Sequence, residues 1–102
     1  MQRYMRLAIY EQTRGTFQEV ADLAKDGMLP RLATEPGFVQ YGVADLGDRK
    51  VCSITIWETR EAAAKSVELA ATWIKENVSD RVKLHTTYVG ELAFFHGAPV
   101  LT

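Results

Sequence analysis

Small polar and aromatic side chains alternate along two consecutive segments of the chain, and they are the residues best suited to hold a flat ligand. Ser53, Thr55 and Trp57 stand two positions apart, and so do Phe38 and Gln40. Residues two apart on a strand point to the same face. An indole can stack on an aromatic ring and donate a hydrogen bond, while hydroxyl and amide groups can position a substrate oxygen. We therefore expect these five residues to line a ligand pocket.

A hairpin between the two segments predicts which residues share a face. Gly47-Asp48-Arg49-Lys50 is typical of a tight turn. A two- or four-residue loop there predicts three pairs: Gly42 with Ser53, Gln40 with Thr55, and Phe38 with Trp57. The opposite face then carries an almost wholly apolar row: Tyr41, Val43, Cys52, Ile54 and Ile56. A one-residue bulge would undo this assignment.

Each of these residues also has a structural interpretation that needs no ligand. Trp57 can be a core residue at the end of a strand, and Ser53, Thr55 and Gln40 can be strand residues that fill the sheet. Both interpretations stay open at the level of the sequence.

The cysteine, the histidines and the glycines indicate no nucleophilic, metal-binding or phosphate-binding site. Cys52 is the single cysteine, so an internal disulfide and a site of several thiolates are excluded, and its β-branched neighbours indicate a buried, inert thiol. His85 and His96 are eleven positions apart, which is not a spacing of metal ligands, and solvated strand edges explain them. The glycines form no phosphate-binding loop. We expect no metal and no cofactor.

Length and charge restrict the class of protein. The 102 residues predict one domain, 1–102, and the net charge of −1 argues against a nucleic-acid partner. No stretch approaches the ~20 apolar residues of a membrane helix. The N-terminal residues lack the apolar core of a signal peptide, so a cytoplasmic location is the default expectation.

Hydrophobic periodicity predicts four strands and two helices. Thr16 and Glu19 form a capping box that begins the first helix, Pro30 should kink or restart it near Met28, and Pro36-Gly37 ends it. Thr59 is the expected N-cap of the second helix. The strands are expected over 4–12, 38–46, 51–58 and 86–96. The order βαββαβ is that of an α+β, ferredoxin-like fold with two helices on one face of a four-stranded antiparallel sheet.

The strands are apolar on both faces, although two helices can cover only one. Leu7 and Ile9 oppose Ala8 and Tyr10 in the first strand, and the third and fourth strands repeat this pattern. A large uncovered apolar patch marks an interface. We therefore expect a homodimer joined through the sheet faces. The alternative is that the C-terminal tail, with Val100 and Leu101, folds back over the sheet.

The chain resembles the antibiotic biosynthesis monooxygenase superfamily of dimeric α+β barrels over about residues 4–96. The resemblance rests on three motifs: Pro36-Gly37-Phe38, the Gly47-Asp48 hairpin, and the run from Ile56 to Ala62. It implies a dimer with a substrate cavity between sheet and helices in each subunit. In some members the substrate itself passes an electron to O₂ without metal or flavin.

The resemblance gives Trp57 a catalytic role, since it matches the strand-end tryptophan of those oxygenases. There an asparagine four residues earlier and a tyrosine six residues later accompany the tryptophan, and this chain has Ser53 and Ala63 instead. Members that degrade haem use a helix histidine, and residues 60–78 contain Trp73 but no histidine.

Two functions of different classes follow. The first is a cofactor-independent monooxygenase acting on a small aromatic or quinol-like substrate. The second is a non-catalytic dimeric barrel, which either binds a small apolar ligand or fills its cavity with its own side chains.

Overall fold

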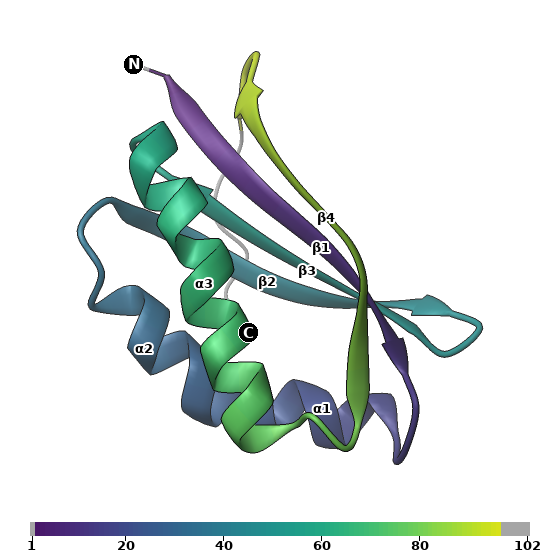
Figure 1. Ribbon diagram of the computed structural model, residues 1–102. Helices are drawn as coiled ribbons and strands as arrows, with labels where there is room; N and C mark the ends of the chain where they lie inside the picture. Colours follow the sequence, from purple (N-terminus) through teal and green to yellow (C-terminus); the bar gives the residue numbers. More distant parts are fainter. Residues whose placement is uncertain (1, 97–102) are drawn as a thin grey trace.

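A four-stranded antiparallel sheet with helices against one face forms the fold (Figure 1). The computed structural model describes residues 2–96. The elements are β1 (Arg3–Gln12), α1 (Phe17–Leu23), the π-helical segment η1 (Ala24–Met28), α2 (Leu29–Ala33), β2 (Phe38–Gly47), β3 (Lys50–Trp57), α3 (Arg60–Asn77) and β4 (Val82–Leu92). The strand order is β2-β3-β1-β4. The predicted ferredoxin-like α+β fold is confirmed.

The first helical region begins at the predicted capping box. The Glu19 N–H donates to Thr16 Oγ1 at 3.3 Å, and the Thr16 N–H donates to Glu19 Oε1, also at 3.3 Å. Arg81 binds the same carboxylate at 2.6 Å and ties the helix to the segment before β4. Arg81 first, and Thr16 second, lower the pKa of Glu19.

The same region changes its helical geometry before Pro30. The Leu29 N–H donates to the Ala24 carbonyl, five residues back, which is the bond of a π-helix. The wider turn accommodates Pro30, which has no N–H and would crowd a regular α-helical turn. The restart that the sequence predicts near Met28 is therefore confirmed, since α2 begins at Leu29.

α3 covers the middle of the sheet with a narrow stripe of small residues. Thr59 is its N-cap, and its hydroxyl accepts from the Ala62 N–H at 3.1 Å. The buried residues of the helix are Ala63, Ser66, Ala70 and Trp73. The small side chains bring the helix close to the sheet, while Trp73 reaches towards η1.

Two bulges in β2 change the register that the hairpin predicted. The two-residue loop Asp48-Arg49 has positive φ at both positions, as in a type I′ turn. Shifts then occur between Asp45 and Gly47 and between Phe38 and Gln40. Phe38 pairs with Trp57 as expected. The other two expected pairs are wrong, because Gln40 pairs with Ile56 and Gly42 with Ile54.

β4 lies earlier in the chain than the sequence predicted. It spans Val82–Leu92 instead of 86–96, and a shift in its pairing with β1 lies between Ile9 and Tyr10. Phe94 and Phe95 follow the strand and are exposed. The alternating apolar pattern that continued through them does not belong to the sheet.

The two faces of the sheet differ in what covers them. The core between sheet and helices contains twelve buried residues: Ala8, Tyr10, Val20, Ala24, Met28, Leu32, Trp57, Ala63, Ala70, Trp73, Val78 and Val82. The open face carries the half-buried Met5, Leu7, Ile9 and Ile54, and no described helix lies over it (Figure 1). Val100 and Leu101, which the alternative to a dimer invoked, lie outside the described residues.

Candidate functional site

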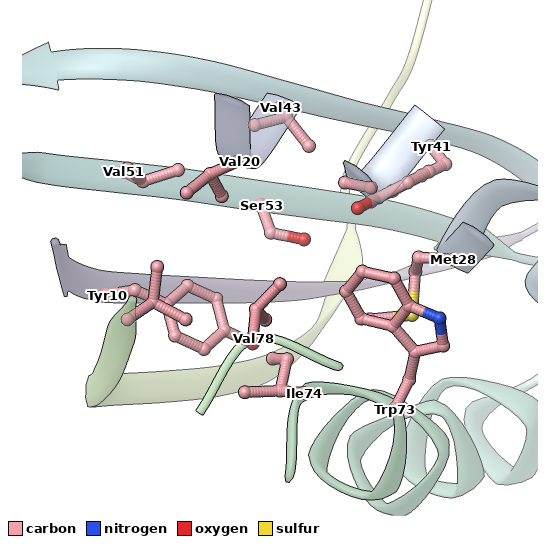
Figure 2. Close-up of a pocket in the computed structure, with 12 residues that line it drawn as sticks. Tyr10, Val20, Met28, Tyr41, Val43, Val51, Ser53, Trp73, Ile74 and Val78 are labelled. Carbon is pink, nitrogen blue, oxygen red and sulfur yellow. The ribbon is translucent and has the colours of Figure 1, made fainter. Parts of the chain in front are cut away.

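A small cavity lies between the sheet and the helices (Figure 2). Its volume is about 40 Å³, and its walls come from β1, β2, β3, α1, η1, α3 and the start of β4. The lining residues are Tyr10, Val20, Ala24, Met28, Tyr41, Val43, Val51, Ser53, Trp73, Ile74, Val78 and Val82. Ligand pockets usually measure about 300–1,000 Å³. As it stands, the cavity has room for water only.

Three hydroxyl groups give this mostly apolar cavity a polar wall. Tyr41 and Ser53 direct their hydroxyl groups towards one another, and Tyr10 lies on the neighbouring strand (Figure 2). Burial raises the pKa of Tyr41 to about 12, and the Ser53 hydroxyl and the positive charge of Arg6 offset part of this effect. Tyr41 therefore stays a neutral phenol near pH 7 and can donate a hydrogen bond into the cavity.

A buried positive charge lies behind that polar wall. Arg6 is only 2% exposed. Its Nη2 donates to the Tyr10 hydroxyl at 3.1 Å, and its Nε donates to Thr87 Oγ1 at 3.1 Å. Within residues 2–96, no carboxylate forms an ion pair with Arg6; the five ion pairs found there involve Arg14, Arg31, Arg60, Lys65 and Arg81. Buried arginines are normally paired, so the site holds an uncompensated charge.

Two buried donors beside Arg6 have no hydrogen-bond partner among the described residues. They are Thr55 Oγ1 and the indole nitrogen of Trp57. Thr55 pairs directly with Arg6 across β1 and β3, and Trp57 follows two positions along the same face of β3. Buried polar groups without a partner are uncommon and indicate that an acceptor belongs there.

The structure separates the five residues predicted to bind a ligand. Ser53 lines the cavity. Thr55 and Trp57 share its face of β3 but are fully buried beyond the cavity wall, and Phe38 contacts Trp57 edge-on, with ring centroids 5.6 Å apart. Trp57 therefore does not line this cavity. Gln40 lies opposite Ile56, away from Ser53, in a surface hollow shared with Gln2, Arg3 and Glu91.

Three residues in or beside the site were not predicted there from the sequence. Tyr41 and Val43 were expected on the open face, but they pair with Thr55 and Ser53 and line the cavity. The cause is the bulge between Asp45 and Gly47, which shifts β2 by one residue. Arg6 was not singled out, because a charged residue in an alternating strand normally indicates the solvent face.

The other reactive residues lie outside this site. Cys52 is on the open face, and burial raises the pKa of its thiol, which disfavours a thiolate nucleophile. His85 and His96 are exposed, as expected. Residues 2–96 contain no group of three or more histidine, cysteine or acidic residues placed to hold a metal ion. Nor does any helix in that range have the length and apolarity to cross a membrane.

Comparisons with known proteins find relatives of this fold among solved structures only. No protein-family model matches the sequence, and no curated protein matches it. Among solved structures, SnoaB, a cofactor-independent oxygenase from Streptomyces nogalater, superposes with a TM-score of 0.66 at 12% identity, covering 98% of this chain and 100% of that one. A candidate antibiotic biosynthesis monooxygenase from Chloroflexus aurantiacus J-10-fl gives 0.65 at 19% identity, covering 93% and 97%.

A third structure has the same fold. A dimeric ferredoxin-like protein from an uncultured marine organism has a TM-score of 0.66 and 14% identity, and the match covers 97% of this chain and 95% of the other. At these identities the likeness is one of fold. It confirms the ferredoxin-like α+β fold.

Proposed function

We propose that this protein is a cofactor-independent monooxygenase that oxidises a small aromatic or quinol-like substrate between the sheet and the helices. The observation that carries the proposal is the row of donor groups along one face of β3. There Thr55 Oγ1 and Trp57 Nε1 are buried and have no hydrogen-bond partner within residues 2–96, on the same face of β3 as Ser53, which lines the cavity. The fold shared with SnoaB, a cofactor-independent oxygenase, supports this choice of chemistry.

In this proposal the protein binds and desolvates the substrate, and the substrate reacts with O₂. An anthrone-type substrate loses two hydrogens from its reacting carbon, gains one oxygen atom from O₂, and releases the other oxygen as water. Trp57 donates a hydrogen bond to the developing oxyanion, Ser53 and Thr55 position the substrate oxygen, and Phe38 holds the indole. Donors placed in advance in a water-excluding site stabilise such charge strongly.

The substrate must enlarge the cavity to bind, because about 40 Å³ is far below the volume of any aromatic ring system. Met28 is the lining residue that can move with the least cost, since its unbranched side chain has several accessible rotamers. Trp73 packs beside it (Figure 2). We expect both side chains to shift when substrate binds.

Oxygen uptake is the direct test. The protein is incubated with a panel of anthrones and quinols, and O₂ consumption is compared with the uncatalysed rate. Trp57→Phe removes the indole N–H but keeps an aromatic ring, and it should reduce kcat at least tenfold. Glu11→Gln, at an exposed position of β1, is the control and should leave kcat unchanged. No uptake above background with any substrate of the panel contradicts the proposal.

The small cavity favours a second candidate, a barrel without catalytic activity whose interior is filled by its own side chains. This candidate predicts that none of the panel compounds changes tryptophan fluorescence or melting temperature. A barrel that only sequesters a ligand predicts saturable fluorescence changes without O₂ uptake. The two measurements together separate the three functions.

We also propose that the protein is a homodimer joined through the open sheet face. Its apolar side chains and the dimeric protein that shares the fold support this arrangement.

A further inference from the structure

The surface hollow that contains Gln40 is much larger than the cavity between the sheet and the helices. Its volume is about 540 Å³, against about 40 Å³ for the cavity. Ordinary ligand pockets measure about 300–1,000 Å³. The start of β1, the start of β2, and the end of β4 with the residues after it form the wall of the hollow. The start of β1 lies beside the end of β4, since Arg3 pairs with Leu92 (Figure 1).

The hollow contains one cation whose charge is not balanced. Arg3 is half-buried, and it forms no ion pair within residues 2–96. The carboxylate of the hollow, Glu91, is already paired with Arg60, with 4.0 Å between Oε1 and Nη2. A single positive charge therefore remains, and it is complementary to a ligand with one negative charge.

Two side-chain amides add neutral donors near this charge. The Tyr4 hydroxyl donates to Gln2 Oε1 at 3.4 Å, which leaves the NH₂ group of Gln2 as a donor for another molecule. Gln40, which the sequence predicted as a ligand-binding residue, contributes the second amide from β2. The polar part of the hollow can therefore bind an anionic oxygen through a cation and neutral N–H groups.

Two exposed aromatic rings give the hollow an apolar part. Phe94 and Phe95 directly follow β4, and they are 84% and 55% exposed. Apolar surface of this kind is stabilised when a flat ring packs against it and removes it from water. The hollow therefore combines one unpaired cation with aromatic surface.

We propose that the hollow binds a small aromatic carboxylate. Arg3 pairs with the carboxylate through its planar guanidinium, Gln2 and Gln40 donate to the same oxygens, and the ring packs against Phe94 and Phe95. A monoanion balances the single charge, whereas a phosphate ester carries about two negative charges. A bare inorganic anion would leave the aromatic part of the hollow unused.

A second copy of the chain is the other candidate occupant. Arg3 lies two positions before Met5 on the same face of β1, so the hollow is at one end of the open sheet face. The half-buried residues of that face are apolar, and a copy that covered the hollow with them would bury Arg3 without an opposite charge. A carboxylate neutralises Arg3, and this difference favours the small anion.

The test is a titration with a readout from the hollow itself. Benzoate and 2-naphthoate are compared with benzamide, 2-naphthamide and inorganic phosphate by two-dimensional NMR, which resolves the side-chain NH₂ signals of Gln2 and Gln40. At least one acid should shift both signals and bind at least threefold more tightly than its amide and than phosphate, a modest factor because the charge pair is partly exposed. If neither acid does so, the proposal is overturned.

Variants assign the preference to the residues of the hollow. Arg3→Met keeps the length of the side chain and removes the charge, so the preference for the acid over its amide should be lost. Arg14→Met removes an exposed charge elsewhere and should keep the preference. Phe95→Ala should weaken the binding of 2-naphthoate at least threefold. A preference that persists in Arg3→Met, or an unchanged affinity in Phe95→Ala, contradicts the assignment.

Two further measurements separate this site from the cavity and from an interface. Trp57→Phe changes the site of the proposed oxygenase and should leave acid binding unchanged; a loss of acid binding would assign the acids to that site and overturn the proposal. Arg3→Met should keep the molar mass of the natural protein in light scattering, and a change from dimer to monomer would assign the hollow to a second copy. Neither measurement uses O₂ uptake, so failure of the oxygenase leaves this proposal intact.

Discussion

At the scale of single residues, the interior of this protein is more polar than a small core needs to be. Arg6, Ser53, Thr55 and Ser66 are all buried, beside the hydroxyl groups of Tyr10 and Tyr41. Ser66 donates to the Ala63 carbonyl of its own helix at 2.6 Å and is satisfied. Thr55 is not. This contrast separates buried polar residues that form hydrogen bonds inside the protein from those whose hydrogen-bonding groups are left for a ligand.

Tyr41 predicts a loss of stability at high pH. Its pKa is about 12 in the folded protein, against an ordinary value of 10.0. The folded state therefore holds the phenolic proton more tightly than the unfolded state does. The contribution of Tyr41 to the free energy of unfolding is complete below pH 10 and is lost as the pH rises towards 12. A shift of this size corresponds to at most about 3 kcal/mol. Urea unfolding between pH 9 and pH 12 measures the decline.

Two phenylalanine variants isolate this contribution. The free energy of unfolding of Tyr41→Phe should fall less across the same pH interval. Tyr88→Phe, at a residue that is 56% exposed, is the control, and its free energy of unfolding should fall as much as that of the natural protein. If the free energy of unfolding falls in parallel for all three proteins, Tyr41 is not responsible for the loss of stability at high pH.

The residues of the site could be predicted only in part. Ser53, Thr55 and Trp57 were placed correctly on one face, because a strand has a strict period of two. Arg6 obeys the same period, but its charge indicated solvent, and only the packing of α3 over β1 makes it buried. Which buried donors lack a partner also depends on the whole fold, so no pattern in the sequence indicates it.

At the scale of elements, the local signals were reliable and the register was not. The Thr16 and Thr59 caps and the restart before Pro30 were predicted, since each depends on a few consecutive residues. The hairpin was also predicted, but its two-residue loop is Asp48-Arg49, one residue later than the expected Gly47-Asp48. The bulges in β2 depend on how two strands twist against each other. That is why Gln40 was expected in the cavity and Tyr41 outside it, when the structure has the reverse.

The π-helical segment is held against α3 by a close contact. A Cβ atom added at Gly27 would lie 2.8 Å from Cζ2 of Trp73. Gly27→Ala should therefore lower the free energy of unfolding by about 1–3 kcal/mol through overpacking, despite the gain of ~0.5–1 kcal/mol in helix propensity. Urea denaturation measures the change. Gly90→Ala, where a Cβ meets nothing within 4 Å, is the control, and a variant at Gly27 as stable as the natural protein would be inconsistent with this packing.

The N-cap of α3 makes a second prediction at this scale. Thr59→Ala removes the acceptor of the Ala62 N–H and should lower the free energy of unfolding by about 1 kcal/mol. Thr59→Ser keeps the hydroxyl and should restore most of the stability. Equal destabilisation by both variants would show that the methyl group, and not the cap, is responsible.

At the scale of the whole molecule, the two faces of the sheet differ in what covers them and in the side chains they carry. The helix-covered face holds the polar site, and the open face presents half-buried apolar residues of β1 and β3. The fold class could be predicted because the order of elements and the excess of apolar positions both follow from periodicity.

The proposed dimer is tested by placing a charge on the open face. Ile54→Glu puts a carboxylate in the middle of β3 and should convert the dimer into a monomer, because an unpaired charge is costly in an apolar interface. Leu46→Glu, at a side chain 51% exposed near the hairpin, should remain a dimer. Light scattering gives the molar mass. If the natural protein has the mass of one chain, or if Ile54→Glu keeps the dimer, the interface is not this face.

The bulges described above also determine how the chain avoids uncontrolled association. β2 and β4 are the two edge strands, and the pairing of each is interrupted by a register shift. Irregular edges are poor templates for a further strand, so sheets do not extend from chain to chain into fibres. In the proposed dimer, association uses the open sheet face instead, and a face that meets its own copy through a twofold axis is closed after one partner.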